Sequence, residues 1–267
     1  VDIYDTQSPS DEFTVHYGKI KSGTISSGES VTASVDSKLR SETANNHTAT
    51  HLLHAALREI LGKHVRQHGS LIDPHHLRFD FSHTKPLSKS EINKIEQMVN
   101  EKIRQNIQVS HQLRSFNDAV NEGAIAFFGD KYSEDVYVVE MTDGITFSKE
   151  VCGGTHVHRT GNLGMCIITS ESSIGSGMRR IEAVTGRSAE DILFQQKDII
   201  ETISQKLETT TDHITTKLES RLGELKDLKQ LVNQFEKQHS KDYADSLLSK
   251  KQSINGISIV ATKVESS

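Results

Sequence analysis

Two short motifs constrain this fold more than any other feature of the sequence: HTATH, which begins at His47, and CGGTH, which begins at Cys152. On a helix, His47 and His51 lie at i and i+4, so both imidazoles leave the same face about 6 Å apart, as two ligands of one metal do. In the second motif, two glycines form a turn on which the side chains of Cys152 and His156 converge. The sequence therefore predicts a fold that brings both motifs to one metal ion.

Zinc, one Zn2+ ion per chain, is the metal that these donors predict, because zinc takes cysteine sulfur and histidine nitrogen together. Four protein ligands are typical of structural zinc, whereas catalytic zinc keeps one position open, so the role of the ion is left undecided. Thr48 excludes a metalloprotease helix, which needs a glutamate directly after its first histidine. The competing interpretation makes Cys152 a small buried hydrophobe and His156 a hydrogen-bonded core residue. His54 is a further candidate on nearly the same helix face.

Hydrophobic periodicity predicts a β-rich start followed by an α+β domain. The first forty residues contain short alternating segments punctuated by glycines, the last of them over residues 31–35, which predict small antiparallel or barrel-like packing. Near Asn46 the period changes to that of a helix, which we expect Asn46 to cap and Gly62 to stop.

The rest of the chain continues as mixed structure and then becomes helical. Strands are expected at residues 77–81, 136–141, 166–169 and 178–184. Ser88 and Glu91 form a capping box before a second helix. After Gly186 the apolar residues follow three-four spacing, which predicts a long helical hairpin or coiled coil with a break at residues 210–212.

Composition excludes several classes of protein. The chain has 31 Lys+Arg against 36 Asp+Glu, a net charge of −5, so no global basic field marks it as a nucleic-acid binder. No apolar run approaches the roughly 20 residues that span a bilayer, no signal peptide is recognisable, and two cysteines are too few for a disulfide framework. We expect a soluble, cytoplasmic protein. Because the chain starts without methionine and ends within an apparent strand, we expect it to be part of a longer polypeptide.

Four segments of the sequence resemble the editing domain of bacterial alanyl-tRNA synthetases. They are NNHTATHLLHAALREILGKHVRQHGSLIDPHHLRFDFSH from Asn45, GAIAFFGDKY from Gly123, CGGTHV from Cys152 and GMRRIEAVTG from Gly177. Related editing domains, in threonyl-tRNA synthetases and free-standing AlaX-type deacylases, share the paired HxxxH and CxxxH motifs. CGGTH and RFDFSH are similar to the alanine-specific family in particular.

The resemblance implies an α+β protein in four parts. These are part of a small β-barrel over residues 1–40, a zinc-containing editing domain over 41–186, a helical coiled-coil segment over 187–253 and the start of a truncated C-terminal domain over 254–267. The ATP-dependent aminoacylation core of the family would lie upstream. The zinc ligands carried over are His47, His51, Cys152 and His156.

The activity implied by the resemblance is deacylation: hydrolysis of the ester that joins serine or glycine to tRNA(Ala). An apolar synthetic pocket rejects an added hydroxyl by only about a hundredfold, so a second site that binds the serine hydroxyl is needed. Thr50 and Gln67 match positions that the family associates with the editing pocket, and both carry hydrogen-bonding groups.

Partners follow from the same resemblance. Arg179 and Arg180 are candidate tRNA contacts, although neighbours on a strand face opposite sides and one at most would face the RNA. The long helical segment is a candidate for self-association. The alternative function is a zinc-stabilised tRNA-binding module without catalytic activity, and a third is editing of Ser-tRNA(Thr).

Overall fold

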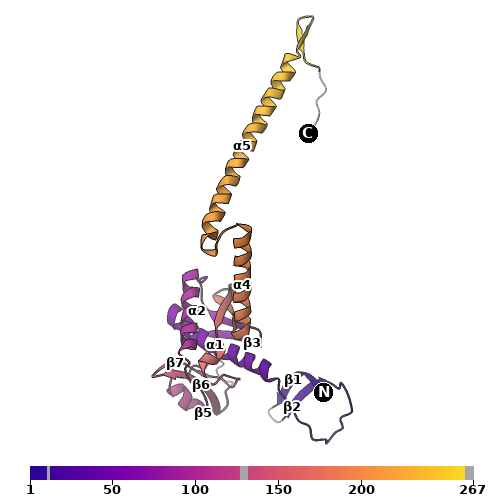
Figure 1. The fold of residues 1–267 in the computed structure, drawn as a ribbon. Helices are drawn as coiled ribbons and strands as arrows, with labels where there is room; N and C mark the ends of the chain where they lie inside the picture. Colours follow the sequence, from indigo (N-terminus) through magenta and orange to yellow (C-terminus); the bar gives the residue numbers. More distant parts are fainter. Residues whose placement is uncertain (11–12, 127–131, 262–267) are drawn as a thin grey trace. The chain divides into compact units, whose positions relative to one another are not determined.

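The computed structural model describes residues 1–10, 13–126 and 132–261, and the chain divides into two compact units (Figure 1). The first unit comprises residues 1–163 and 168–183, and the second comprises residues 164–167 and 184–267. The motif GAIAFFGDKY includes residues 127–131, which lie outside the described residues. None of the described helices has both the length and the apolar character that crossing a membrane requires.

Residues 2–19 form an antiparallel β-hairpin in the segment where we predicted part of a small β-barrel. Strands β1 (Asp2–Ser10) and β2 (Phe13–Lys19) pair antiparallel with each other alone. Residues 20–36 carry neither helix nor strand, so the strand predicted at 31–35 is wrong. Its side chains Val31 and Val35 are 69% and 68% exposed. A barrel requires a closed ring of paired strands, and the described part of this segment supplies only two.

Helix α1 (Ser37–Leu61) carries the HTATH motif and starts earlier than predicted. Its N-cap is Asp36, whose carboxylate accepts hydrogen bonds from the backbone N–H groups of Lys38 and Leu39. The predicted cap, Asn46, is instead a buried residue within the helix that donates its amide N–H to the carbonyl of Asp73 at 2.8 Å. The predicted end is confirmed, because Gly62 is the C-cap with φ 116°.

A four-stranded sheet in the order β3-β4-β9-β8 packs against this helix. The strands are β3 (Gln67–Ile72), β4 (Leu77–Ser82), β8 (Cys166–Gly175) and β9 (Met178–Thr185), so the three strands predicted in this region are confirmed. Phe79 and Phe81 of β4 are fully buried with Leu52 and Leu57 of α1. Helix α2 (Lys89–Arg104) also contacts α1 and begins at the predicted capping box of Ser88.

The CGGTH motif directly follows the last strand of a second, three-stranded antiparallel sheet. This sheet contains β5 (Val109–Ser115), β6 (Asp135–Asp143) and β7 (Ile145–Val151), in that order. The short helix α3 (Phe116–Asn121) lies between β5 and β6 in sequence, and the 3-10 helix η2 (Thr160–Leu163) follows β7. Because β7 contacts α1 and ends one residue before Cys152, the sheet carries the second motif to the first.

The second unit is helical, as predicted after Gly186. Helices α4 (Gly186–Lys206) and α5 (Ile214–Ser249) are separated by the 3-10 turn η3 (Thr211–His213), which confirms the predicted break. A short hairpin of β10 (Gln252–Ile254) and β11 (Ile257–Ile259) follows.

The apolar stripe of α5 is not buried within the chain. Leu222, Leu228 and Phe235 are 59%, 61% and 67% exposed, and no residue of α5 is buried. A hairpin that covers this stripe is therefore absent from the described residues. Burial of the stripe against a second copy of the chain stays a prediction.

A protein shortened to end at Gly186 should fold and still bind one zinc ion, because every candidate ligand and, apart from Ala189, every buried hydrophobic side chain among the described residues precede residue 186. Circular dichroism and zinc stoichiometry of the shortened protein check this expectation. An unfolded shortened protein would show that the domain boundary at residue 186 is misplaced.

Candidate metal centre

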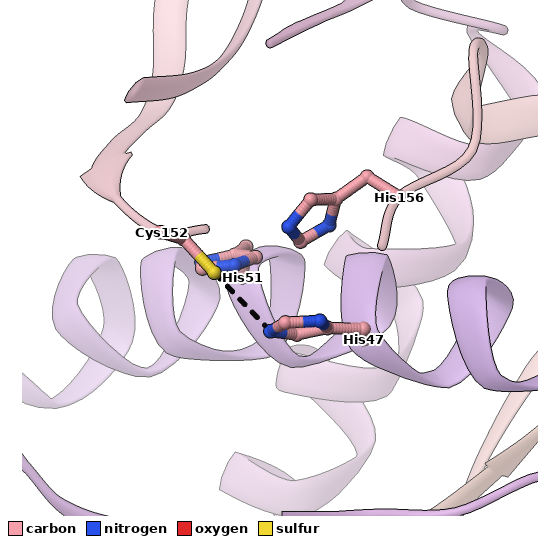
Figure 2. Close-up of side chains that lie close together, drawn as sticks. All are labelled: His47, His51, Cys152 and His156. Atoms are coloured by element: carbon pink, nitrogen blue, oxygen red, sulfur yellow. Dashed lines mark hydrogen bonds between the residues drawn. The ribbon is translucent and has the colours of Figure 1, made fainter. Parts of the chain in front are cut away.

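The structure brings together the four side chains that the two motifs predicted as metal ligands (Figure 2). Together they form the metal cluster: His47, His51, Cys152 and His156. Their ligand atoms all lie within 4.8 Å of one another. The sulfur of Cys152 lies 3.3 Å from Nε2 of His47, and the rings of His47 and His156 have centroids 4.3 Å apart. This grouping of one thiol and three imidazoles could hold a metal ion.

The close approach of the CGGTH loop to α1 depends on a glycine and a threonine. A Cβ atom added at Gly154 would overlap the imidazole ring of His47, so only glycine lets the loop lie this close to the helix. On the same helix, the Thr48 hydroxyl accepts a hydrogen bond from the backbone N–H of Val157 at 3.1 Å and lies 3.4 Å from Nδ1 of His156. Thr48 thereby ties the loop to the helix and orients one ligand ring.

Behind the cluster, a single buried carboxylate contacts two histidines. Oε2 of Glu150 lies 2.8 Å from Nδ1 of His51, and Oε1 lies 2.8 Å from Nδ1 of His54. His54, the further ligand candidate, is therefore outside the cluster; it binds Glu150 and packs against Phe79, with ring centroids 5.4 Å apart. No carboxylate belongs to the cluster itself among the described residues.

Two buried nitrogen atoms indicate that the cluster fits a metal ion. Nε2 of His51 and Nε2 of His156 are buried and have no hydrogen-bond partner in the described part of the chain. A buried polar atom without a partner is costly, and a metal ion would satisfy both. The donor set of one sulfur and three nitrogens is among those that tetrahedral zinc takes.

Electrostatics hold the thiol in its ligand form. Burial by itself raises the pKa of the Cys152 thiol, but its interactions with the His156 and His47 rings outweigh burial and lower the pKa to about 3. Burial lowers the pKa of His156 to about 4, helped by the charges of His51 and His47. At neutral pH the sulfur is therefore a thiolate and the His156 ring is neutral, which are the states that bind a metal.

The buried pair of His51 and Glu150 is charged before a metal binds. Burial works to lower the pKa of His51, but the Glu150 carboxylate outweighs it and raises the pKa to about 10. Burial likewise works to raise the pKa of Glu150, and the His51 charge overrides it, giving about 2. A metal at Nε2 of His51 must displace a proton from that atom, so metal binding releases protons.

Thr50 and Gln67 lie outside the cluster. The Thr50 hydroxyl is buried and donates to the carbonyl of Asn46, one turn earlier in α1, at 2.9 Å. Gln67 begins β3, donates its amide to the Ser70 hydroxyl at 3.1 Å, and lines a cavity of about 570 Å³. Neither side chain hydrogen-bonds to a cluster residue in the part of the chain that is described.

Arg179 and Arg180 both form ion pairs within the protein. Nε of Arg179 lies 2.5 Å from Glu171, on the neighbouring strand β8. Arg180 binds Asp80 of β4 through two parallel hydrogen bonds of 2.7 and 2.8 Å. Contact with an RNA phosphate would have to compete with these carboxylates, and such contact stays a prediction.

Three residues around the cluster were missed by the sequence reasoning: Thr48, Glu150 and His111. Nε2 of His111 lies 3.1 Å from the carbonyl oxygen of Cys152, and its ring centroid is 5.6 Å from that of His156. Glu150 had only one signal, its acidic side chain two positions before a ligand, in a segment where the sequence predicted no strand. His111 had none, because its contact depends on the pairing of β5 with β6.

Part of the chain matches a known family of domains from tRNA synthetases. Residues 136–182 match the family described as the threonyl and alanyl tRNA synthetase second additional domain. That stretch contains β7, the CGGTH motif and most of the sheet strands β8 and β9.

Longer relatives identify the family more narrowly. The chain is 42% identical over 252 residues to an alanine–tRNA ligase of Dehalococcoides mccartyi, which covers 94% of this chain and 29% of the relative. It is 39% identical over 274 residues to that of Chloroflexus aurantiacus, covering 99% and 31%, and 43% identical over 251 residues to that of Hydrogenovibrio crunogenus, covering 94% and 29%. The chain belongs to the bacterial alanine–tRNA ligase family and spans under a third of the length of these relatives.

Proposed function

We propose that this chain hydrolyses the ester bond of tRNA(Ala) that carries serine or glycine in error. The observation that carries the proposal is the convergence of two distant motifs on one buried cluster of a thiol and three imidazoles, within a chain related to alanine–tRNA ligases. The match to a domain found in threonyl and alanyl tRNA synthetases supports it. An aminoacyl ester and an RNA backbone are the substrate groups that such a domain would meet.

The ion in this proposal is zinc, held by His47, His51, Cys152 and His156. Bound zinc would supply a Lewis acid or a fixed anchor for the substrate. The protein contributes the neutral ring of His156, oriented by Thr48, and a thiolate at Cys152. Glu150 is a poor general base, because both of its oxygens are already engaged by imidazoles.

Selectivity is the reason for a second site. Serine differs from alanine by one hydroxyl, and an apolar synthetic pocket discriminates against an added hydroxyl by only about a hundredfold. A site that hydrogen-bonds the hydroxyl prefers the serine ester by a far larger factor, since its polar groups stay unpaired with alanine. In this proposal Thr50 and Gln67 supply those groups, and Arg179 and Arg180 are candidate contacts of the tRNA.

One assay tests the proposal. The purified chain, loaded with zinc, is mixed with Ser-, Gly- and Ala-tRNA(Ala), and release of each amino acid is followed. We expect Ser-tRNA(Ala) and Gly-tRNA(Ala) to be hydrolysed well above their spontaneous rates and Ala-tRNA(Ala) to survive. Binding of tRNA(Ala) without release would favour the non-catalytic zinc-stabilised module, and faster release from Ser-tRNA(Thr) would identify the other substrate.

Thr50→Val should lower the preference for Ser-tRNA(Ala) over Ala-tRNA(Ala) by about tenfold while leaving the zinc content unchanged. The Thr50 hydroxyl donates its hydrogen to the carbonyl of Asn46, so it can only accept a hydrogen bond from the serine hydroxyl. Valine removes that acceptor at nearly constant side-chain volume. Deacylation rates of the three aminoacyl-tRNAs check this, with Thr50→Ser as the matched control. Unchanged discrimination among all three substrates would mean that Thr50 does not recognise the substrate. Gln67 or backbone groups would then have to bind the serine hydroxyl.

A further inference from the structure

The contacts of Glu150 are not explained by metal ligation alone. This carboxylate lies at the end of β7 with a side chain only 3% exposed, and each oxygen takes a different imidazole at 2.8 Å. The Ser148 hydroxyl also donates a hydrogen bond to Oε1 at 3.4 Å. An ionised carboxylate buried this deeply is costly unless it is fully hydrogen-bonded and balanced by positive charge.

The pairing determines which nitrogen of His51 is available to a metal. An ionised carboxylate can only accept hydrogen bonds, so Nδ1 of His51 and Nδ1 of His54 must each carry the donated hydrogen. This leaves Nε2 of His51, which is buried without a hydrogen-bond partner among the described residues, on the side of the other three ligand atoms. The bond to Glu150 therefore fixes the ring orientation and, once a metal has displaced the proton on Nε2, the tautomer.

We propose that Glu150 is a positioning residue that holds His51 with Nε2 directed into the metal cluster, and that His54 holds the carboxylate in place by binding its second oxygen. A carboxylate bonded on one oxygen could rotate about its last side-chain bond. Bonded on both oxygens between two buried rings, it is fixed. The inference rests on the metal centre of the proposed function and is independent of the ester substrate.

Glutamine at position 150 tests this role with almost no change in shape. A carboxamide offers one accepting oxygen and one donating nitrogen, so it cannot accept from both Nδ1–H groups at once. One ring must then change its tautomer or turn away. We expect Glu150→Gln to raise the dissociation constant for Zn2+ by about 10- to 100-fold, which is the usual range for a lost outer-sphere partner. Competition with a chromophoric chelator measures the constant.

Two further variants separate positioning from charge. Glu150→Asp keeps the negative charge but is too short to reach both rings, so we expect it to weaken zinc binding as well. Glu122→Gln removes an equal charge from an exposed carboxylate paired with Arg114 and Lys149, and it should bind zinc like the unmodified protein. If Glu150→Asp bound zinc normally while Glu150→Gln did not, charge alone would matter and the positioning role would be overturned.

A measurement on the unmodified, metal-free protein does not depend on any variant folding. Imidazole 15N NMR distinguishes the protonation of the two ring nitrogens, and we expect Nδ1 of His51 and of His54 to be protonated and hydrogen-bonded. An unprotonated Nδ1 on His51 would overturn the inference. With Co2+ as the probe, the absorption spectrum should also change in Glu150→Gln, because one ligand ring is displaced.

These outcomes are separable from failure of the proposed function. If the unmodified protein bound no Zn2+ at all, the metal centre and this inference would both be overturned. If it bound zinc normally but released no serine from Ser-tRNA(Ala), only the editing activity would fail, and the role of Glu150 would still be decided by the affinities and the NMR spectra.

Discussion

Replacing Cys152 with alanine is expected to reduce bound zinc from one ion per chain to nearly none and to abolish release of serine from Ser-tRNA(Ala). Cys152 is the sulfur donor of the cluster, and its pKa of about 3 makes it an anionic ligand at neutral pH. The three imidazoles that remain are uncharged as ligands, so the site would lose its negative charge. Because the loss of an outer-sphere partner alone costs about 10- to 100-fold in affinity or activity, we expect the loss of a ligand to cost more than about 100-fold.

The second cysteine provides the matched control for this experiment. Cys166 is 1% exposed, lies in β8 and does not belong to the metal cluster. Cys166→Ala therefore should keep one zinc ion per chain and the deacylation rate, apart from a modest loss of thermal stability from the small cavity. Atomic absorption measures the zinc content, and release of serine from Ser-tRNA(Ala) measures the deacylation rate. Full zinc content and full activity in Cys152→Ala would refute this assignment of the metal site.

Local signals in the sequence predicted the parts of the fold that depend on neighbouring residues. The capping box at Ser88 and the stop at Gly62 are local hydrogen-bonding and conformational preferences, and both were confirmed. The start of α1 was misplaced because Asn46 and Asp36 are both good caps by residue type. In the structure Asp36 is the cap, and Asn46 lies within the helix with its side chain bonded to the carbonyl of Asp73.

The strand prediction at residues 31–35 was wrong because alternation describes a strand and not its partner. Val31 and Val35 alternate as strand residues do, yet they are exposed and belong to no strand. The partner of a charged residue is equally hidden in the sequence. Arg180 can be recognised as a cation, but its two hydrogen bonds to Asp80 depend on the register of β4 and β9. Sequence patterns do not report which partner the fold supplies.

The metal cluster was predictable because its ligand types and their spacing are restrictive, whereas its supporting residues were not. Glutamate at position 150 and threonine at position 48 are common residue types with no diagnostic spacing. Their roles arise only when β7 packs on α1, which places Glu150 behind His51 and Thr48 beside His156. Residues that orient ligands therefore need the three-dimensional contacts, even where the ligands can be read from the sequence.

Substituting alanine for Gly154 is expected to displace His47 and weaken zinc binding by about tenfold or more. A methyl group at this position would occupy the space of the His47 ring. Because the obstructed group is the end of a rotatable side chain, the ring can turn away at little cost to the fold. The consequence should therefore be the loss of one well-oriented ligand from a protein that remains folded.

The adjacent Gly153 provides the matched control for this prediction. A methyl group at Gly153 would meet no atom within 4 Å in the described structure, and it changes the composition of the CGGTH loop in the same way. Gly153→Ala should therefore bind zinc and hydrolyse Ser-tRNA(Ala) like the unmodified protein, whereas Gly154→Ala loses affinity and rate together. Zinc titrations and thermal melts of the two metal-free variants distinguish the cases. Equal zinc affinities in the two variants would mean that the loop does not approach His47 as closely as the structure has it, because only that approach makes the two glycines unequal.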